Sequence, residues 1–454
     1  MSIRQPVITR RHFLAGSAAL GFSTALPGCA ARFGQAAPIV FVHGNGDTAA
    51  LWHTTFWRWE SNGFDTDRLF AIDFPYPLAR NVDATYQAYR SSSADQREQL
   101  AAFVAEAKRR TGAPKVVLVG SSRGGNAIRN YIKNGGGAAH VSHAVLCGTP
   151  NHGVLVSDKA LVGSEFNGAS PFLRQLNEGP TEVVPGVAWM TTRSDNADKF
   201  AQADGAALGM PGQPTGVTAE GPALKGAKDV VLAGLDHREV AFHPKAFAAV
   251  WEFVMGGAPA TTGISSESSP LLNGKVNDMV RGAGTNLPVA GAVVEVYETD
   301  PKTGVRRALV HKQTTGEDGY WGPFRGSSRA TYEFVISTPD HPTTHIYRSP
   351  FARSSQIVHL RPGVLTDKDK AAASSVTISR PRGYFGAARG DIVTFDGQPG
   401  PGIPPGIPVN STSTLLLPAG TAQRSVTCRF NDEVIAVQSW PVADNRVVIA
   451  ELHY

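Results

Sequence analysis

Cysteine is scarce in this sequence of 454 residues, which contains only three. Three cysteines are too few for the disulfide frameworks that hold small secreted domains together, so the fold has to depend on apolar cores. The chain also has no C-x-x-C or H-E-x-x-H pattern for a metal, and no G-x-G-x-x-G pattern for a dinucleotide. The sequence therefore predicts neither a metal ion nor a cofactor.

Long apolar runs and clusters of like charge are missing as well. No apolar stretch is long enough to cross a bilayer as a helix. The formal net charge is +5, and beyond the arginines near the N-terminus this excess is spread thinly along the chain. Proteins that bind nucleic acids concentrate basic residues on one surface, so we expect no nucleic-acid partner.

The first 37 residues predict an export signal. Residues 9–14 (Thr-Arg-Arg-His-Phe-Leu) resemble the twin-arginine motif, and residues 14–26 supply a short, weakly apolar stretch. Residues 26–29 end in the Gly-Cys of a bacterial lipoprotein signal, and cleavage after Ala30 is an equal alternative. We expect an exported protein, periplasmic or extracellular, and leave a lipid anchor at Cys29 open.

Residues 116–132 contain the most informative pattern in the chain. An apolar run at 116–119 predicts a buried strand, and apolar residues at helical spacing follow a turn of small residues. The turn is a G-x-S-x-G motif at residues 120–124, in the strand–turn–helix context that this motif requires. Small residues on both sides let the strand and helix pass closely, so Ser122 is the candidate nucleophile.

The segment at residues 38–46 predicts the other half of an oxyanion hole. An apolar strand runs into a His-Gly turn, and the backbone N–H of Asn45 follows it. The N–H of Arg123, at the start of the helix after the nucleophile, would supply the second donor. His43 precedes the nucleophile in the chain and is interpreted as a turn residue.

Six apolar segments predict the strands of one sheet. Helical or glycine-rich connections separate them, and residues 93–110 predict an amphipathic helix that opens with Ser93 and Gln96 as a capping pair. Buried strands separated by crossovers predict an α/β fold with a doubly wound, mainly parallel sheet. The predicted strands begin at residues 38, 69, 116, 143, 187 and 230.

The partners of Ser122 are expected beyond later strand ends, acid first and histidine second. A polar turn after the strand ending at residue 192 holds Asp195 and Asp198, and the turn after the last strand holds His237. His237 is therefore the candidate base. Asp198 is the preferred acid and Asp195 is the alternative.

These motifs, taken in order, resemble α/β-hydrolases of the bacterial and archaeal triacylglycerol lipase group. The resemblance implies Ser122, Asp198 and His237 as the triad, with Asn45 and Arg123 as oxyanion donors, in a carboxylic ester hydrolase. Ser121 departs from the histidine usual before the nucleophile, and Arg123 departs from the usual apolar or glutamine residue after it. The motifs are Val-His-Gly-Asn (42–45), Val-Gly-Ser-Ser-Arg-Gly-Gly (119–125), Cys-Gly-Thr-Pro-Asn-His-Gly (147–153), Arg-Ser-Asp-Asn-Ala-Asp (193–198) and Leu-Asp-His (235–237).

The remainder of the chain predicts β structure. A small, polar stretch at 257–270 predicts a linker after a catalytic domain at 38–256. Residues 271–365 resemble the β-sandwich of carboxypeptidase regulatory-like domains, and residues 366–454 predict a second β-rich region. Two longer connections, 154–184 and 200–228, would emerge beside the site, either as a lid or acyl-binding wall or as plain scaffold.

The resemblance implies a lipase or esterase that forms an acyl-enzyme on Ser122. A depolymerase of polyesters such as polyhydroxyalkanoates is the alternative within the same chemistry, because appended β modules often hold enzymes on insoluble substrates. A non-catalytic surface-binding protein on a hydrolase scaffold is the alternative from another class. The expected partner is an apolar or polymeric ester, and the oligomeric state is left open.

Overall fold

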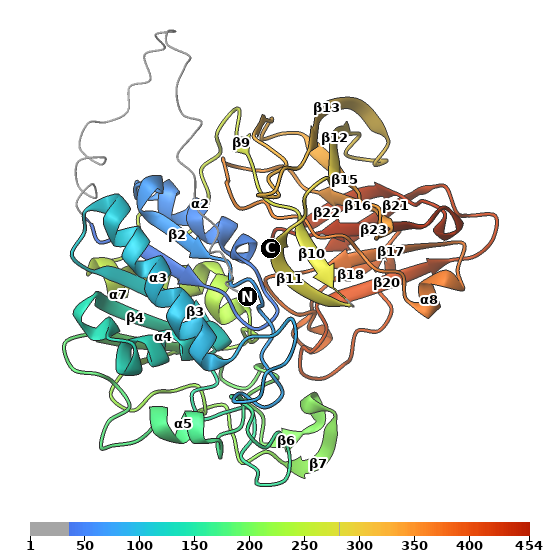
Figure 1. Ribbon diagram of the computed structural model, residues 1–454. Coiled ribbons are helices and arrows are strands. Elements are labelled where there is room, and N and C mark those ends of the chain that lie inside the picture. The colour runs from blue at the N-terminus through green and yellow to red at the C-terminus, as the bar shows by residue number, and fades with distance from the viewer. Residues whose placement is uncertain (1–35, 281) are drawn as a thin grey trace, which may run out of the picture.

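The computed structural model describes residues 36–280 and 282–454. Most of the predicted export signal, including the arginine pair and Cys29, lies outside the described residues. Figure 1 shows a parallel sheet with its helices, coloured blue to green, beside a β-rich region, coloured yellow to red. Within the described part of the chain, no helix is both long enough and apolar enough to cross a membrane.

The six predicted strands form one sheet, with every neighbouring pair parallel. This confirms the α/β fold class. The last strand begins and ends two residues earlier than expected, at β8 (Lys228–Val231). The order across the sheet is β2 (Leu69–Ile72), β1 (Ile39–Val42), β3 (Val116–Ser121), β4 (Val141–Cys147), β5 (Ala188–Arg193) and β8.

Helices cover both faces of this sheet. Alternate residues of β1 and β3 face opposite sides, as the two-residue period of a strand requires. One set packs with α3 (Ser93–Thr111) and α4 (Arg123–Asn134), and the other packs with α2 (His53–Ser61) and α7 (Pro244–Met255). A parallel sheet buried on both faces explains why its strands are almost continuously apolar.

The start of α3 corrects the predicted capping pair. The cap is Ser92, whose side chain accepts a hydrogen bond from the N–H of Asp95, while the Asp95 side chain accepts from the N–H of Ser92. The predicted pair, Ser93 with Gln96, is therefore wrong by one residue. Three consecutive serines at 91–93 make the register ambiguous in the sequence, and the aspartate at the third helical position decides it.

The β-rich region is organised around a seven-stranded sheet. Its last strand, β23 (Arg446–Glu451), runs parallel to both β16 (Thr343–Arg348) and β17 (Ser374–Ser379). The predicted boundary at residue 365 therefore runs through one hydrogen-bonded sheet. The other strands of this sheet are β12 (Val293–Thr299), β13 (Arg306–Thr314), β15 (Thr331–Ser337) and β20 (Thr412–Leu417).

Smaller sheets and short helices complete the molecule. A four-stranded sheet holds β18 (Val393–Phe395), β19 (Gln398–Pro399), β21 (Ser425–Phe430) and β22 (Glu433–Gln438). Two-stranded pairs are β10 (Asn277–Val280) with β11 (Ala283–Pro288), β9 (Leu271–Leu272) with β14 (Phe324–Arg325), and β6 (Asp204–Gly205) with β7 (Met210–Pro214). The short helices are α5 (Pro171–Leu176), α6 (Glu239–Phe242) and α8 (Asp367–Lys370).

Helix α2 joins the two regions. Trp59 of this helix and Trp52, just before it, are buried against the parallel sheet, whereas Trp57 belongs to the apolar core of the β-rich region. The Trp57 indole N–H donates to the carbonyl of Ser354 at 2.9 Å. The β-rich region is therefore packed directly onto the catalytic fold and is not a module on a free tether.

Candidate active site

Ser122 occupies a strained corner between β3 and α4. Its backbone has φ 51° and ψ −123°, a region that non-glycine residues rarely adopt. A side chain on Gly120 would lie 2.8 Å from the backbone of Gly124, and one on Gly124 would lie 2.5 Å from the carbonyl of Val42. Only small residues allow this crossing, and the corner raises the Ser122 side chain at the carboxyl edge of the sheet.

Asp198 and His237 lie together in the fold. Oδ2 of Asp198 is 2.8 Å from Nδ1 of His237, and both side chains are buried. The other carboxylate oxygen of Asp198 accepts the N–H of Phe200 at 2.8 Å, and the Phe200 ring packs edge-on against the imidazole. The acid is thus fixed by a backbone donor, and the imidazole is fixed by the acid and the aromatic ring.

Asp195, the alternative acid, binds backbone N–H groups instead of the imidazole. Its carboxylate accepts hydrogen bonds from the N–H groups of Gly234, at 3.0 Å, and Asn196, at 2.8 Å. The bond from Gly234 is the main cause that lowers the pKa of Asp195. This side chain ties the acid turn to the turn before His237 and makes no contact with the imidazole.

Ser122 and His237 border the same short segment at the end of β4. The N–H of Ser122 donates to the carbonyl of Cys147 at 2.8 Å, and a side chain on Gly148 would lie 3.3 Å from Nδ1 of His237. No hydrogen bond joins the Ser122 hydroxyl to the imidazole within residues 36–280. Such bonds are commonly long without substrate and tighten when a substrate fills the site.

The turn after β1 lies against Ser122. A side chain on Gly44 would lie 3.1 Å from Cβ of Ser122. Asn45 is the next residue in the chain after this close contact. The Asn45 side chain accepts the N–H of Ala79 at 2.7 Å, which fixes the turn. Arg123 is the first residue of α4, so its N–H has no acceptor within the helix.

The Arg123 side chain has a role that the sequence did not reveal. Its guanidinium is fully buried and donates to Glu165, at 2.8 Å from Nε, to the carbonyl of Pro77 and to Ser91. Burial raises the pKa of Glu165, while the charge of Arg123 opposes that effect. Arg123 therefore anchors the loops that follow β2 and β4.

His43 is a structural residue, as expected. Nε2 accepts the N–H of Phe74 at 3.1 Å, which leaves Nδ1 to donate to the carbonyl of Gly44 at 2.9 Å. Complete burial lowers the pKa of His43 and favours this neutral form. The Asn286 amide, from the β-rich region, donates to the carbonyls of Asp47 and Phe74 beside it.

Arg238 connects two of the turns that bear candidate site residues. Its guanidinium donates to Oδ1 of Asp47 at 3.0 Å, which joins the turn that bears His237 to the turn that bears Asn45. Sequence reasoning assigned no role to Arg238 or to Asp47. Nothing in the local pattern shows the pair, because 191 positions separate its members.

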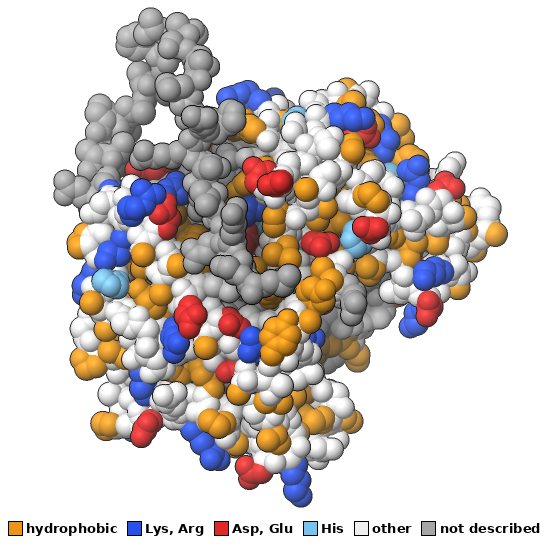
Figure 2. Space-filling view, viewed as in Figure 1, with side chains coloured by type: hydrophobic (Ala, Val, Ile, Leu, Met, Phe, Trp, Pro, Cys, Tyr) orange, Lys and Arg blue, Asp and Glu red, His pale blue; other side chains and the backbone are white. Residues whose placement is uncertain are grey.

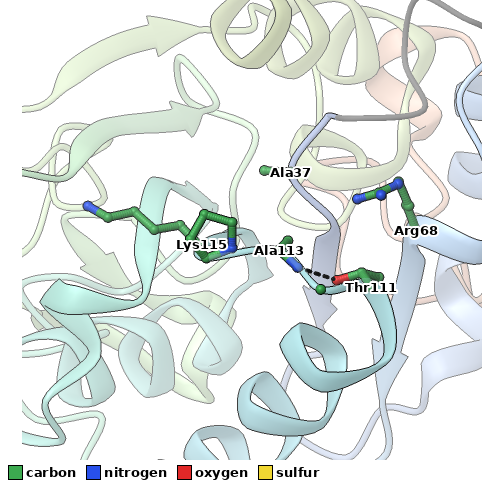
Figure 3. Close-up of a pocket in the computed structure, with 7 residues that line it drawn as sticks. Ala37, Arg68, Thr111, Ala113 and Lys115 are labelled. Carbon is green, nitrogen blue, oxygen red and sulfur yellow. Dashed lines mark hydrogen bonds between the residues drawn. The ribbon is translucent and has the colours of Figure 1, made fainter.

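A shallow pocket lies at the opposite edge of the sheet (Figure 3). Its lining includes Ala37, Arg68 and residues 111–115, which precede β1, β2 and β3. In this view the amine end of Lys115 lies away from the other labelled residues, and the dashed line joins Thr111 to Ala113. This pocket is separate from the candidate site, because its lining residues precede β3 whereas Ser122 comes directly after β3.

Among the described residues, no group of three or more His, Cys, Asp or Glu side chains could hold a metal ion.

A parallel sheet with a serine on its strained strand-to-helix corner, and an Asp–His pair beyond later strands, is the architecture of the α/β-hydrolases. Comparison with known families makes this more specific. Residues 36–213 match the model of the family described as Lipase (class 2), and residues 272–364 match the model described as Lipase C-terminal domain. Two separate parts of the chain therefore match lipase family models, which supports a carboxylic ester hydrolase.

Several solved structures are similar to parts of this chain. The mature lipase BlEst2 of Bacillus licheniformis is 22% identical, covers 48% of this chain and 91% of its own, and has a TM-score of 0.35. Lipase B of Aspergillus fumigatus is 16% identical, covers 51% of this chain and 56% of its own, and has a TM-score of 0.37. The carboxylesterase CesB of Bacillus subtilis is 16% identical, covers 49% of this chain and 85% of its own, and has a TM-score of 0.27.

Proposed function

We propose that this protein is an exported lipase or esterase that cleaves esters through an acyl-enzyme on Ser122. The observation that carries the proposal is the Asp198–His237 pair, buried and 2.8 Å apart, at the carboxyl edge where Ser122 stands on its strained corner. A nucleophile, a base and an orienting acid in this arrangement form the set that serine hydrolysis requires.

The reaction follows from the positions of these groups. Nε2 of His237 takes the Ser122 proton as Oγ attacks the ester carbonyl carbon, and Asp198 stabilises the imidazolium. The N–H groups of Asn45 and Arg123 donate to the oxyanion. The imidazolium then protonates the departing alcohol. A water molecule, deprotonated by His237, releases the acid and restores Ser122.

Exposed apolar side chains on the loops that leave the carboxyl edge of the sheet support an apolar substrate. Val82 and Tyr86 follow β2, Leu161 and Val162 follow β4, and all four are 41–80% exposed. The two loops are joined, because the N–H of Asp83 donates to the carbonyl of Gly163 at 2.9 Å. In the face shown in Figure 2, acidic and basic side chains are interspersed. We therefore favour an ester with an apolar acyl chain over a polyanionic partner.

Replacement of the nucleophile tests the mechanism. With p-nitrophenyl butyrate, Ser122→Ala should lower kcat by about a million-fold, the size of loss found for a triad nucleophile. The matched control is Ser121→Ala, which removes the neighbouring buried hydroxyl and should keep kcat within about tenfold of wild type. Turnover that survives Ser122→Ala would refute the proposal.

The substrate class is tested by direct comparison. Turnover should be highest on a triglyceride emulsion or a long-chain ester and low on a polyhydroxyalkanoate film. A higher rate on the film would assign the chain to polyester depolymerisation with the same residues in the same roles.

Export is tested through the motif at residues 9–14. Arg10→Lys with Arg11→Lys should retain the folded enzyme inside the cell, since twin-arginine transport requires the pair. Incorporation of labelled palmitate that is lost in Cys29→Ser would show a lipid anchor. Export that persists in the double lysine variant would exclude the twin-arginine route.

A further inference from the structure

The turn that bears His237 contains two buried carboxylates, Asp236 before the imidazole and Glu239 after it. Oδ1 of Asp236 accepts the N–H of Glu239 at 3.0 Å, and Oε2 of Glu239 accepts the N–H of Asp236 at 2.9 Å. This reciprocal pair has the form of a capping box and closes the backbone around His237. The position of the imidazole therefore depends on both carboxylates staying where they are.

Two arginines from the β-rich region neutralise these carboxylates. Arg380 and Arg389 each pair with Glu239 at 2.5 Å and with Asp236 at 3.4 Å. The N–H of Tyr384 adds a bond to Oδ2 of Asp236 at 2.7 Å. The two guanidiniums are themselves held together, since both donate to the carbonyl of Tyr384 at 2.6 Å.

Without the arginines, the two carboxylates would repel each other in a buried site. Burial, and then the charge of Glu239, raise the pKa of Asp236 to about 6 even with the guanidiniums present. Two like charges without their counterions are strongly unfavourable away from water. The turn would relieve this by moving a carboxylate outward, and the chain between them includes His237.

The same segment touches the other catalytic turns. Arg238 donates to the carbonyl of Pro381 with one nitrogen and to Asp47 with the other. Lys199, next to the acid Asp198, lies 4.2 Å over the Tyr384 ring and donates to the carbonyl of Val409. Contacts from residues 380–409 thus reach the acid turn and the base turn, and through Arg238 the oxyanion turn.

We propose that residues 380–391 form a clamp in which Arg380 and Arg389 act as positioning residues for His237, by holding the carboxylates of Asp236 and Glu239. The proposal rests on the assignment of His237 as base. The β-rich region then contributes residues that position a catalytic side chain. Neither arginine needs to contact the substrate.

The test is Arg380→Gln with Arg389→Gln, assayed on a short soluble p-nitrophenyl ester. Misplacement of a catalytic group by about 1 Å can cost about 100-fold in rate. We expect kcat to fall by about 10- to 100-fold with KM nearly unchanged, and Arg389→Lys to keep most of the activity that Arg389→Gln loses. If the double variant does not fold, Arg389→Gln against Arg389→Lys makes the same comparison, because Arg389 is partly exposed.

Arg353→Gln is the matched control. Arg353 also joins the β-rich region to the catalytic fold, through Glu60 at the far end of α2, at 2.9 Å. It should lower the unfolding temperature as the clamp variants do, yet keep the wild-type kcat. A kcat for the clamp variants equal to that of Arg353→Gln would overturn the proposal, and so would an Arg389→Lys variant as slow as Arg389→Gln.

Failure of the clamp and failure of the hydrolase assignment give different results. The assignment fails if wild-type turnover survives Ser122→Ala. In that case the clamp is tested by NMR of protein with isotope-labelled histidine. The signal of His237 is identified as the one that disappears in His237→Gln. The clamp variants should shift the His237 signal, and Arg353→Gln should not. An unshifted signal in the clamp variants would contradict the clamp independently of activity.

Discussion

Asp195 and Asp198 belong to one polar turn, yet they differ in what they bind. The carboxylate of Asp198 reaches the imidazole of His237, and that of Asp195 is occupied by two backbone donors. From the sequence, both were candidates, because a turn with two aspartates shows which residue types are present but not which one faces the histidine. The backbone path of the turn decides this, and it is set by contacts with the loop at Gly234.

The contrast between the two aspartates predicts different kinetics. Asp198→Asn should lower kcat by about 10⁴-fold, because the amide would stabilise the wrong tautomer of His237. Asp195→Asn should keep kcat within about tenfold and lower the unfolding temperature slightly. Steady-state kinetics on p-nitrophenyl butyrate checks both. Equal losses in the two variants would contradict the assignment of the acid.

The buried pair of Arg123 and Glu165 makes a prediction for stability. Arg123→Met leaves Glu165 buried without a counterion, which costs about 3–5 kcal/mol of unfolding free energy. Glu165→Gln in the same chain should recover part of that loss. The control is Arg109→Met, which breaks an exposed pair with Glu106 and should leave the free energy of unfolding nearly unchanged. Urea unfolding gives the free energy of unfolding of each variant. Equal losses in Arg123→Met and Arg109→Met would contradict the stabilising role of the buried pair.

At the scale of elements, the strands and the corner at Ser122 were predictable, because apolar runs and the G-x-S-x-G motif are local signals. The cap of α3 was missed by one residue among three serines, and β8 begins and ends two residues earlier than predicted. Both errors concern element ends, which local patterns define least sharply.

The close approach of α4 to the turn after β4 is a testable element contact. A side chain on Gly125 would lie 1.9 Å from Oγ1 of Thr149, far inside van der Waals contact. Gly125→Ala should therefore destabilise the fold by about 3 kcal/mol or more, the upper end for overpacked sites. Gly257→Ala meets no atom within 4 Å and serves as the control. Thermal unfolding that shows no difference between the two would contradict the packing.

At the scale of the whole molecule, the contacts between the two regions were not predictable from the sequence. A linker and a change to β pattern indicated a separate module. The structure instead buries Trp57, His53 and His453 at one interface, and His453 lies 400 positions after His53. Pairings of this kind depend on the docked surfaces, and no local pattern of residues encodes them.

The interface contains a chain of hydrogen bonds that requires neutral histidines. Arg382 donates to Nδ1 of His53, which leaves Nε2 of His53 to donate to Nδ1 of His453 at 3.0 Å. Nε2 of His453 then donates to the carbonyl of Ser349 at 3.1 Å. Burial, and then the charges of Arg348 and Arg382, lower the pKa of His453 to about 3. Burial and Arg382 also lower the pKa of His53.

These shifts predict loss of stability in acid. Because the pKa of His453 is lower in the folded than in the unfolded chain, its contribution is complete above about pH 6.5 and falls as the pH drops below that value. Between pH 6 and pH 4.5, wild type should lose about 1.4 kcal/mol per pH unit more than His453→Gln. His140→Gln, at an exposed site, should retain the wild-type slope. Urea unfolding at several pH values measures this, and parallel slopes for wild type and His453→Gln would contradict it.

The central claim is that an acyl group is carried on Ser122, and the most direct measurement is mass spectrometry of the enzyme quenched in acid during turnover of a p-nitrophenyl ester. We predict that the acyl mass is found on the peptide that contains Ser122, and that it is absent from His237→Gln treated in the same way. An acyl group on another residue, or steady turnover with Ser122 never modified, would contradict the account.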